Sequence, residues 1–111
     1  MTNNEFNKGS KFSFKNSIDY NSNAIVSKHL LKKSTGNISL FAFDKGEELS
    51  EHTAPFDAMI YIVDGKADVI IDGKSNILQA NEVIIMPANI PHGLIAIEAF
   101  KMVLTMIRDK N

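Results

Sequence analysis

The chain of 111 residues contains no cysteine. Disulfide bonds, thiolate nucleophiles and cysteine-based zinc or iron–sulfur sites are therefore excluded. Arg108 is the only arginine among the twelve cationic residues, and the formal net charge is −1. We therefore expect neither a basic face that binds nucleic acid nor a bidentate arginine site for phosphate groups.

Long apolar segments are also absent. No run approaches the roughly 18 apolar residues that would span a bilayer. Residues 1–23 are rich in Asn, Lys and Ser and lack the apolar core of a signal peptide. Glycine-rich phosphate loops, the GxSxG elbow and the HExxH motif are missing as well. The sequence predicts a cytoplasmic protein without a membrane partner or an organic cofactor.

What remains is the pattern of an all-β domain over residues 24–111. Short apolar segments alternate with turn residues about every eight to twelve positions, as in sandwiches and barrels. The pairs Asp64-Gly65 and Asp72-Gly73 are strong hairpin signals, because glycine reaches a positive φ at little cost. The expected strands are 24–31, 37–43, 58–63, 66–71, 74–78, 82–86, 92–97 and 100–107.

Residues 1–23 are predicted to form a polar leader before this domain. Lys11-Phe12-Ser13-Phe14-Lys15 alternates between polar and apolar residues, so part of the leader could add a short edge strand. The segments 60–63, 69–71 and 83–86 are apolar at both strand parities. Both faces of these strands then need cover. A homodimer would provide it, and residues 11–31 are the alternative cover.

His52 lies between two well-spaced glycines. Gly46, His52 and Gly65 have the spacing of a motif that runs glycine, five residues, His-x-His, three or four residues, glutamate, six residues and glycine. This is the first motif of the cupins, and the chain resembles a small single-domain cupin of the RmlC-like type. Ala54 and Ala58 stand where the family has its second histidine and its glutamate.

His92 follows a turn that contains two prolines. The second cupin motif runs glycine, five residues, Pro-x-Gly, two residues and histidine, and Asn81, Pro87, Asn89 and His92 occupy its places. Asparagine replaces both glycines, and it tolerates the left-handed conformation better than most residues, so both turns should survive. The resemblance covers residues 37–107 and implies a double-stranded β-helix, the cupin jelly-roll barrel, whose open mouth holds any active site.

The resemblance implies a metal site that is incomplete here. His52 and His92 remain as candidate ligands, and stable sites usually need three or four protein ligands. Asp57 is the candidate third ligand if Pro55 bends the strand. Such a set would suit one divalent ion, Fe(II), Mn(II), Ni(II) or Zn(II). In a regular strand, Asp57 would instead point away from the lumen.

Two functions follow from these residues. The first is binding of a small molecule in the barrel mouth, with or without a divalent metal. Ala54 and Ala58 favour this because they leave room for a compact apolar cavity. The alternative is a metal-dependent cupin enzyme of the oxygenase or isomerase type that uses His52, His92 and Asp57. A purely structural role for both histidines also remains open.

The other notable side chains have expected places in the fold. His29 lies outside both motifs and is expected at the surface or an interface. Methionines 59, 86, 102 and 106 are expected to fill the core.

Overall fold

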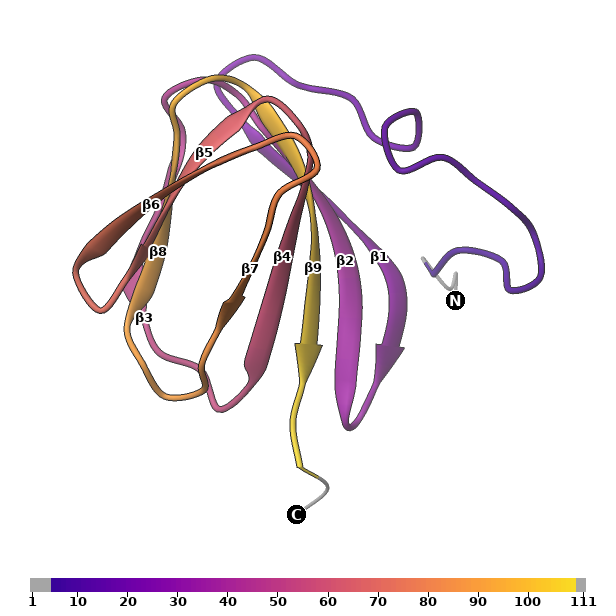
Figure 1. Ribbon diagram of the computed structural model, residues 1–111. Helices are drawn as coiled ribbons and strands as arrows, with labels where there is room; N and C mark the ends of the chain where they lie inside the picture. The colour runs from indigo at the N-terminus through magenta and orange to yellow at the C-terminus, as the bar shows by residue number, and fades with distance from the viewer. Residues whose placement is uncertain (1–4, 110–111) are drawn as a thin grey trace.

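The computed structural model describes residues 5–109, and within them the chain forms nine strands in two antiparallel sheets (Figure 1). The strand orders are β1-β2-β9-β4-β7 in one sheet and β3-β8-β5-β6 in the other. This jelly-roll barrel confirms the predicted fold class. No helix in the described part is long and apolar enough to cross a membrane. The strands are β1 (Ile25–Lys33), β2 (Gly36–Phe43), β3 (Glu48–His52), β4 (Asp57–Asp64), β5 (Lys66–Ile71), β6 (Lys74–Gln79), β7 (Val83–Met86), β8 (His92–Ala96) and β9 (Phe100–Ile107).

The turns form where the sequence provides residues for a positive φ. Gly65 between β4 and β5 has a φ of 85°, and the β5–β6 hairpin turns through Asp72 and Gly73, at 51° and 78°. Asn81 and Asn89 have φ values of 72° and 65°. The prediction that asparagine would preserve the two motif turns is therefore confirmed.

Strand β3 is the element that the sequence patterns did not predict. Its residues, Glu-Leu-Ser-Glu-His, are mostly polar and exposed, and Leu49 is the partly buried exception. β3 pairs with β8 in the register Leu49↔Leu94 and His52↔His92. Backbone pairing rather than an apolar face thus defines this strand. The other eight strands match the predicted segments to within two residues at every end.

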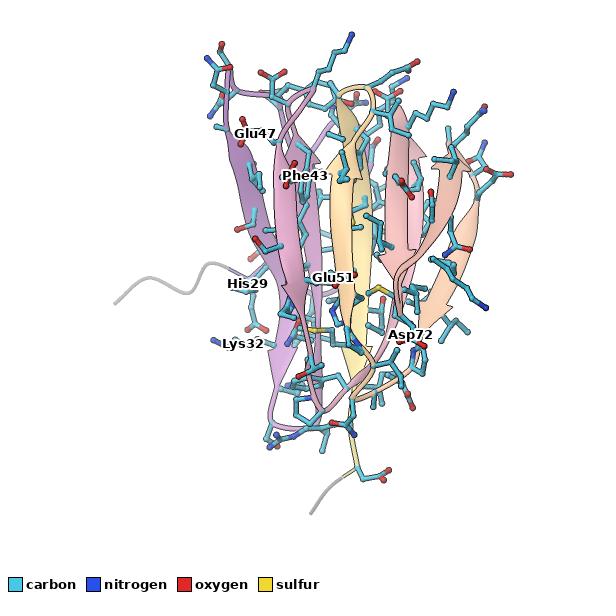
Figure 2. All side chains as sticks on the ribbon, turned by 90° about the vertical axis from the view of Figure 1, so that its left-hand side faces the viewer. His29, Lys32, Phe43, Glu47, Glu51 and Asp72 are labelled. Atoms are coloured by element: carbon cyan, nitrogen blue, oxygen red, sulfur yellow. The ribbon has the colours of Figure 1, made fainter. Side chains whose placement is uncertain are left out.

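The core fills one end of the barrel more completely than the other. Phe43 and Phe100 are fully buried, and their rings stack with centroids 4.5 Å apart. Phe43 lies nearer the upper end in Figure 2, whereas Glu51 and Asp72 lie nearer the lower end. The β3–β4 and β7–β8 connections also lie at the lower end of the barrel in Figure 1. This lower end, with the two histidines, is the mouth.

The leader packs on the barrel without forming a strand in residues 5–23. Its alternating segment ends in a turn at Phe14, where Ser17 N donates to the Phe14 carbonyl, so the predicted edge strand does not form there. Ile18 is 1% exposed and packs with Leu40 and Val103 on the outer face of β2 and β9. The leader thus covers only part of the outer face, whereas the alternative to a dimer required residues 11–31 to provide the whole cover. Residues 1–4 and 110–111 lie outside the described residues.

Polar contacts connect Lys15 and Tyr20, near the end of the leader, to the barrel. The Tyr20 hydroxyl donates to the Asp64 carboxylate over 2.8 Å. Lys101 Nζ donates to the Lys15 carbonyl over 2.6 Å and lies 5.1 Å from the centroid of the Tyr20 ring. Burial of the hydroxyl, assisted by its hydrogen bond to Asp64, raises the pKa of Tyr20 above the usual tyrosine value of 10.0.

We expect alkaline titration to distinguish the two tyrosines of the chain. Because the folded-state pKa of Tyr20 is raised, its contribution to stability is complete below pH about 10 and is lost as the pH rises further. Phenolate absorbance should show a late step, above the usual tyrosine value, that belongs to Tyr20. Tyr20→Phe should remove the late step, whereas Tyr61→Phe should keep it. Loss of the late step in Tyr61→Phe instead would contradict the assignment.

Candidate ligand-binding site

The two predicted site histidines lie side by side at the barrel mouth. His52 ends β3, His92 begins β8, and the two residues are direct cross-strand partners. Their ring centroids are 4.5 Å apart with an interplanar angle of 60°, an edge-to-face arrangement. The prediction that a closed barrel brings both imidazoles to one place is therefore confirmed by the geometry.

Backbone carbonyls select the tautomer of both rings. His52 Nδ1 lies 2.9 Å from the Ser50 carbonyl oxygen, and His92 Nδ1 lies 3.1 Å from the Ile90 carbonyl oxygen. A carbonyl oxygen only accepts, so Nδ1 is the protonated nitrogen in each of these hydrogen bonds. In the neutral rings Nε2 then carries the lone pair. In both histidines, Nε2 is therefore the nitrogen that can accept a hydrogen bond or bind a metal ion.

Asp57 does not join the histidines. It begins β4 on the outward parity, beside the inward Ala58, and its Oδ1 accepts from Ala88 N over 2.9 Å. Asn89 N also donates to the Ala54 carbonyl, over 2.8 Å. Regular strand alternation thus turns the carboxylate away from the lumen. The hydrogen bond of Asp57 instead connects the start of β4 to the β7–β8 turn, which directly precedes His92.

Gly93 permits the close approach of the two histidine strands. A Cβ atom at this position would lie 2.9 Å from the Leu49 carbonyl oxygen and 3.3 Å from Glu51 N. A larger residue would therefore force β8 away from β3, and the His52–His92 pair would separate. This role was not predicted from the motifs. The available signal was a glycine inside an apolar strand, which often marks close backbone approach.

A cavity of about 70 Å³ lies behind the histidines. Of the described residues that line it, His52 and His92 are the only ionisable ones. Ala54 and Ala58, the replacements for two motif ligands, both contribute to its wall, so the predicted apolar space is present. The other lining residues are Phe41, Leu49, Phe56, Ile60, Met86, Gly93, Leu94, Met102, Leu104 and Met106.

Three of the four methionines expected in the core line this cavity. Met86 and Met102 are buried, and Met106 is partly buried. Met59 is different, because it is 39% exposed on the outer face of β4, so the prediction that it fills the core is wrong. Its outward strand parity is the physical reason. His29 is exposed on β1, near Lys32 in Figure 2, as predicted for a surface residue.

The described residues do not provide the ligand set of a tight metal site. No group of three or more His, Cys, Asp and Glu side chains that could hold an ion occurs within residues 5–109. Two imidazoles fall short of the three or four protein ligands usual for a divalent ion. The predicted site of His52, His92 and Asp57 is thus not assembled in this geometry.

Comparison with known proteins agrees with the fold. The chain is similar to a conserved protein of unknown function from Streptococcus pyogenes, with 31% identity, 98% of this chain and 95% of that chain covered, and a TM-score of 0.91. It is also similar to a cupin superfamily protein from Desulfitobacterium hafniense, with 26% identity, coverage of 96% and 97%, and a TM-score of 0.85.

A cupin 2 conserved barrel domain protein from Leptotrichia buccalis is 37% identical with a TM-score of 0.85. That match covers 87% of this chain but 47% of the other, so the chain spans about half the length of that relative. No curated protein gives a significant match. The family model of the cupin domain matches residues 39–108. The chain belongs to the cupin family.

Proposed function

We propose that the protein binds a small, uncharged and largely apolar molecule in the barrel mouth. The cavity behind the two histidines carries this proposal. Its wall is apolar except for two imidazoles that share one tautomer and leave Nε2 to accept a hydrogen bond. Enclosed apolar surface with a few convergent polar groups is the usual composition of a small-molecule site. No specific reaction follows from these residues.

The size and polarity of the cavity restrict the ligand. A volume of about 70 Å³ admits an apolar group of a few heavy atoms, with the remainder at the mouth. The lining residues among those described include no Lys, Arg, Asp or Glu, so a charged group would enter without a permanent counter-charge. A hydroxyl or N–H group at the edge of the apolar part could donate to His52 or His92.

The metal-dependent enzyme with His52, His92 and Asp57 stays a prediction, as does the single divalent ion. The outward position of Asp57 leaves it without support from the geometry. Cytoplasmic residence likewise remains a prediction from the sequence. Metal-free binding is the function that the cavity supports best.

Isobutanol is a suitable probe because it joins a small branched apolar group to one hydroxyl donor. We expect it to shift the methyl NMR signals of Met86, Met102 and Met106 in protein labelled at the methionine methyl groups. Met59, on the outer face, should not move. The double variant His52→Ala/His92→Ala should weaken binding about two- to tenfold, because it removes both acceptors that the single hydroxyl proton could use.

His29→Ala is the matched control, because His29 is an exposed imidazole on β1, and it should leave binding unchanged. Isobutyrate, the charged analogue, should bind more weakly than isobutanol. Unmoved lining methyl groups at millimolar isobutanol would reject the proposed site. Addition of Zn²⁺ or Mn²⁺ tests the metal prediction separately. Stoichiometric binding lost in His52→Ala and in Asp57→Ala would restore the enzyme alternative.

A further inference from the structure

Phe56 forms a part of the cavity wall that does not belong to a strand. It lies in the connection between β3 and β4, is half-buried, and lines the cavity behind the histidines. Ala54 is the only other described lining residue outside the strands, and its side chain is a single methyl group. Among these residues, the Phe56 ring is therefore the one large group of the wall that no strand holds.

The backbone on both sides of Phe56 is held by hydrogen bonds. The Ala54 carbonyl accepts from Asn89 N over 2.8 Å, and the Asp57 carboxylate accepts from Ala88 N over 2.9 Å. Asp57 is also the first residue of β4. The ring can therefore leave the wall by rotation of its side chain between staggered conformations, while the connection itself stays in place.

The side of the Phe56 ring that faces away from the cavity adjoins the only arginine of the chain. The Arg108 guanidinium carbon lies 5.6 Å from the centre of the ring, in a cation–π arrangement. Arg108 N donates to the Thr35 carbonyl over 2.9 Å, which fixes the backbone just beyond β9. The guanidinium makes no hydrogen bond or ion pair to any residue within 5–109. Its N–H groups can therefore bind a ligand.

A polar hollow of about 290 Å³ lies on the Arg108 side of the ring. Its lining includes Asp57, Asn89, Arg108 and Asp109. The end of β9 and the two connections around the hollow lie at the lower end of the barrel in Figure 1, as the mouth does. The apolar cavity and the polar hollow are thus neighbouring compartments with the Phe56 ring between them. Together they reach the range of roughly 300–1,000 Å³ that is usual for a ligand pocket, whereas the cavity alone does not.

The charges of the hollow favour a neutral polar group. The charged residues that line it within the described part of the chain are Arg108, Asp57 and Asp109. A carboxylate group of a ligand would meet two like charges there, and an ammonium group would meet the guanidinium. A carboxamide avoids both conflicts, because its oxygen accepts from the guanidinium while its N–H groups donate to a carboxylate.

We propose that the polar hollow is the second half of the ligand site and binds a carboxamide group. The apolar part of the ligand occupies the cavity, the Phe56 ring rotates out of the wall, and the carboxamide oxygen accepts from Arg108. Binding in the hollow rests on the proposed function, because it extends the ligand that the cavity holds. Phe56 and Arg108 are then specificity-determining residues, which distinguish a ligand with the carboxamide from a purely apolar one.

Isocaproamide is a suitable probe, because two methylene groups join its branched apolar end to a carboxamide, a length that suits the 5.6 Å between the Phe56 ring and Arg108. In protein labelled with ¹⁵N at arginine, the Nε–H group of Arg108 gives a single NMR signal, since the chain has no other arginine. We expect isocaproamide to shift this signal and the methyl signals of Met86 and Met102. Isobutanol, which fills the cavity alone, should shift only the methyl signals.

The affinities of three variants give a second measurement. Arg108→Met keeps an unbranched side chain without donors, and it should weaken isocaproamide binding about tenfold and leave isobutanol binding unchanged. Lys45→Met is the matched control, because Lys45 is exposed two residues from Glu47, at the opposite end of the barrel in Figure 2. It should change neither affinity. Phe56→Ala removes the partition, so it should weaken isobutanol binding and leave isocaproamide bound.

The outcomes separate the hollow from the cavity. If isobutanol binds but isocaproamide leaves the Arg108 signal unmoved, the hollow is no part of the ligand site, and the proposed function stands without it. An isocaproamide affinity that is unchanged in Arg108→Met would also overturn the proposal. So would tighter binding of the charged analogues, isocaproate or isohexylamine, than of the amide. If neither isobutanol nor isocaproamide shifts the methionine signals, the proposed function fails and the second half of the site fails with it.

Discussion

Gly65→Ala is expected to lower the free energy of unfolding by about 3 kcal/mol. Gly65 has a φ of 85°, a conformation that costs other residues about 1–2 kcal/mol. In addition, a Cβ atom there would lie 1.9 Å from the Ala99 carbonyl oxygen and 2.7 Å from Phe100 Cα. Both neighbours are backbone atoms, so the turn between β4 and β5 must move, at a further cost of about 1–3 kcal/mol.

Gly73→Ala separates these two costs. Gly73 also follows an aspartate in a hairpin turn and has a φ of 78°, but a Cβ atom there would meet no atom of residues 5–109 within 4 Å. Its substitution should therefore cost only about 1 kcal/mol. Urea unfolding of both variants at one fixed protein concentration gives the comparison, since dimer formation would shift apparent stability by mass action. Equal losses would show that the predicted clash with Ala99 is relieved without cost.

The turns and most strands could be predicted because local chemistry decides them. Asp64-Gly65 and Asp72-Gly73 each permit a positive φ, and the apolar segments between them can only be buried in a sheet. Strand β3 could not be recognised in this way. Its polar residues match a solvated loop, and it is a strand because β8, some forty residues later, offers it backbone partners. Such a non-local pairing leaves no periodic signal in the strand itself.

The sequence likewise predicted some residues of the candidate site and not others. Motif spacing correctly brought His52 and His92 together, because the spacing of turns in a closed barrel determines which strands meet. The position of Asp57 depended on one local question, whether Pro55 bends the strand. β4 instead pairs in regular register with β7 and β9 from its first residues, so strand parity keeps Asp57 outside. Phe41, Met102 and Leu104 reach the cavity from distant strands, and no motif could have indicated them.

The sequence predicted that the outer face of the sheet needs cover, but it did not predict which residues provide that cover. Apolar residues at both strand parities indicated that the outer face needs cover. The leader supplies this cover through Ile18, which is isolated among polar residues in the sequence. A single apolar residue in a polar segment carries no periodicity, so its burial becomes evident only with the barrel in place. Met59 and Ile85 remain exposed beside it, and the homodimer stays a prediction.

Phe100→Ala should have the largest effect of any substitution considered, a loss of about 4 kcal/mol in the free energy of unfolding. Phe100 is fully buried, and its ring stacks on Phe43 at 4.5 Å and 16°. Truncation would leave a void in the core beside the Phe43 ring and remove an aromatic contact of about 1 kcal/mol. Denaturant unfolding at fixed protein concentration measures the loss. Phe100→Leu keeps most of the volume and should cost no more than about 1.5 kcal/mol.

The same pair of variants tests whether the two ends of the barrel act independently. Phe43 and Phe100 do not line the cavity, whereas Phe41 and Met102 on the same two strands do. Phe100→Leu should therefore bind isobutanol as the wild type does, although it is less stable. A weakened affinity in this folded variant would show that packing at the filled end sets the shape of the mouth. Unchanged affinity would mean that packing at the filled end contributes to stability but does not affect ligand binding at the mouth.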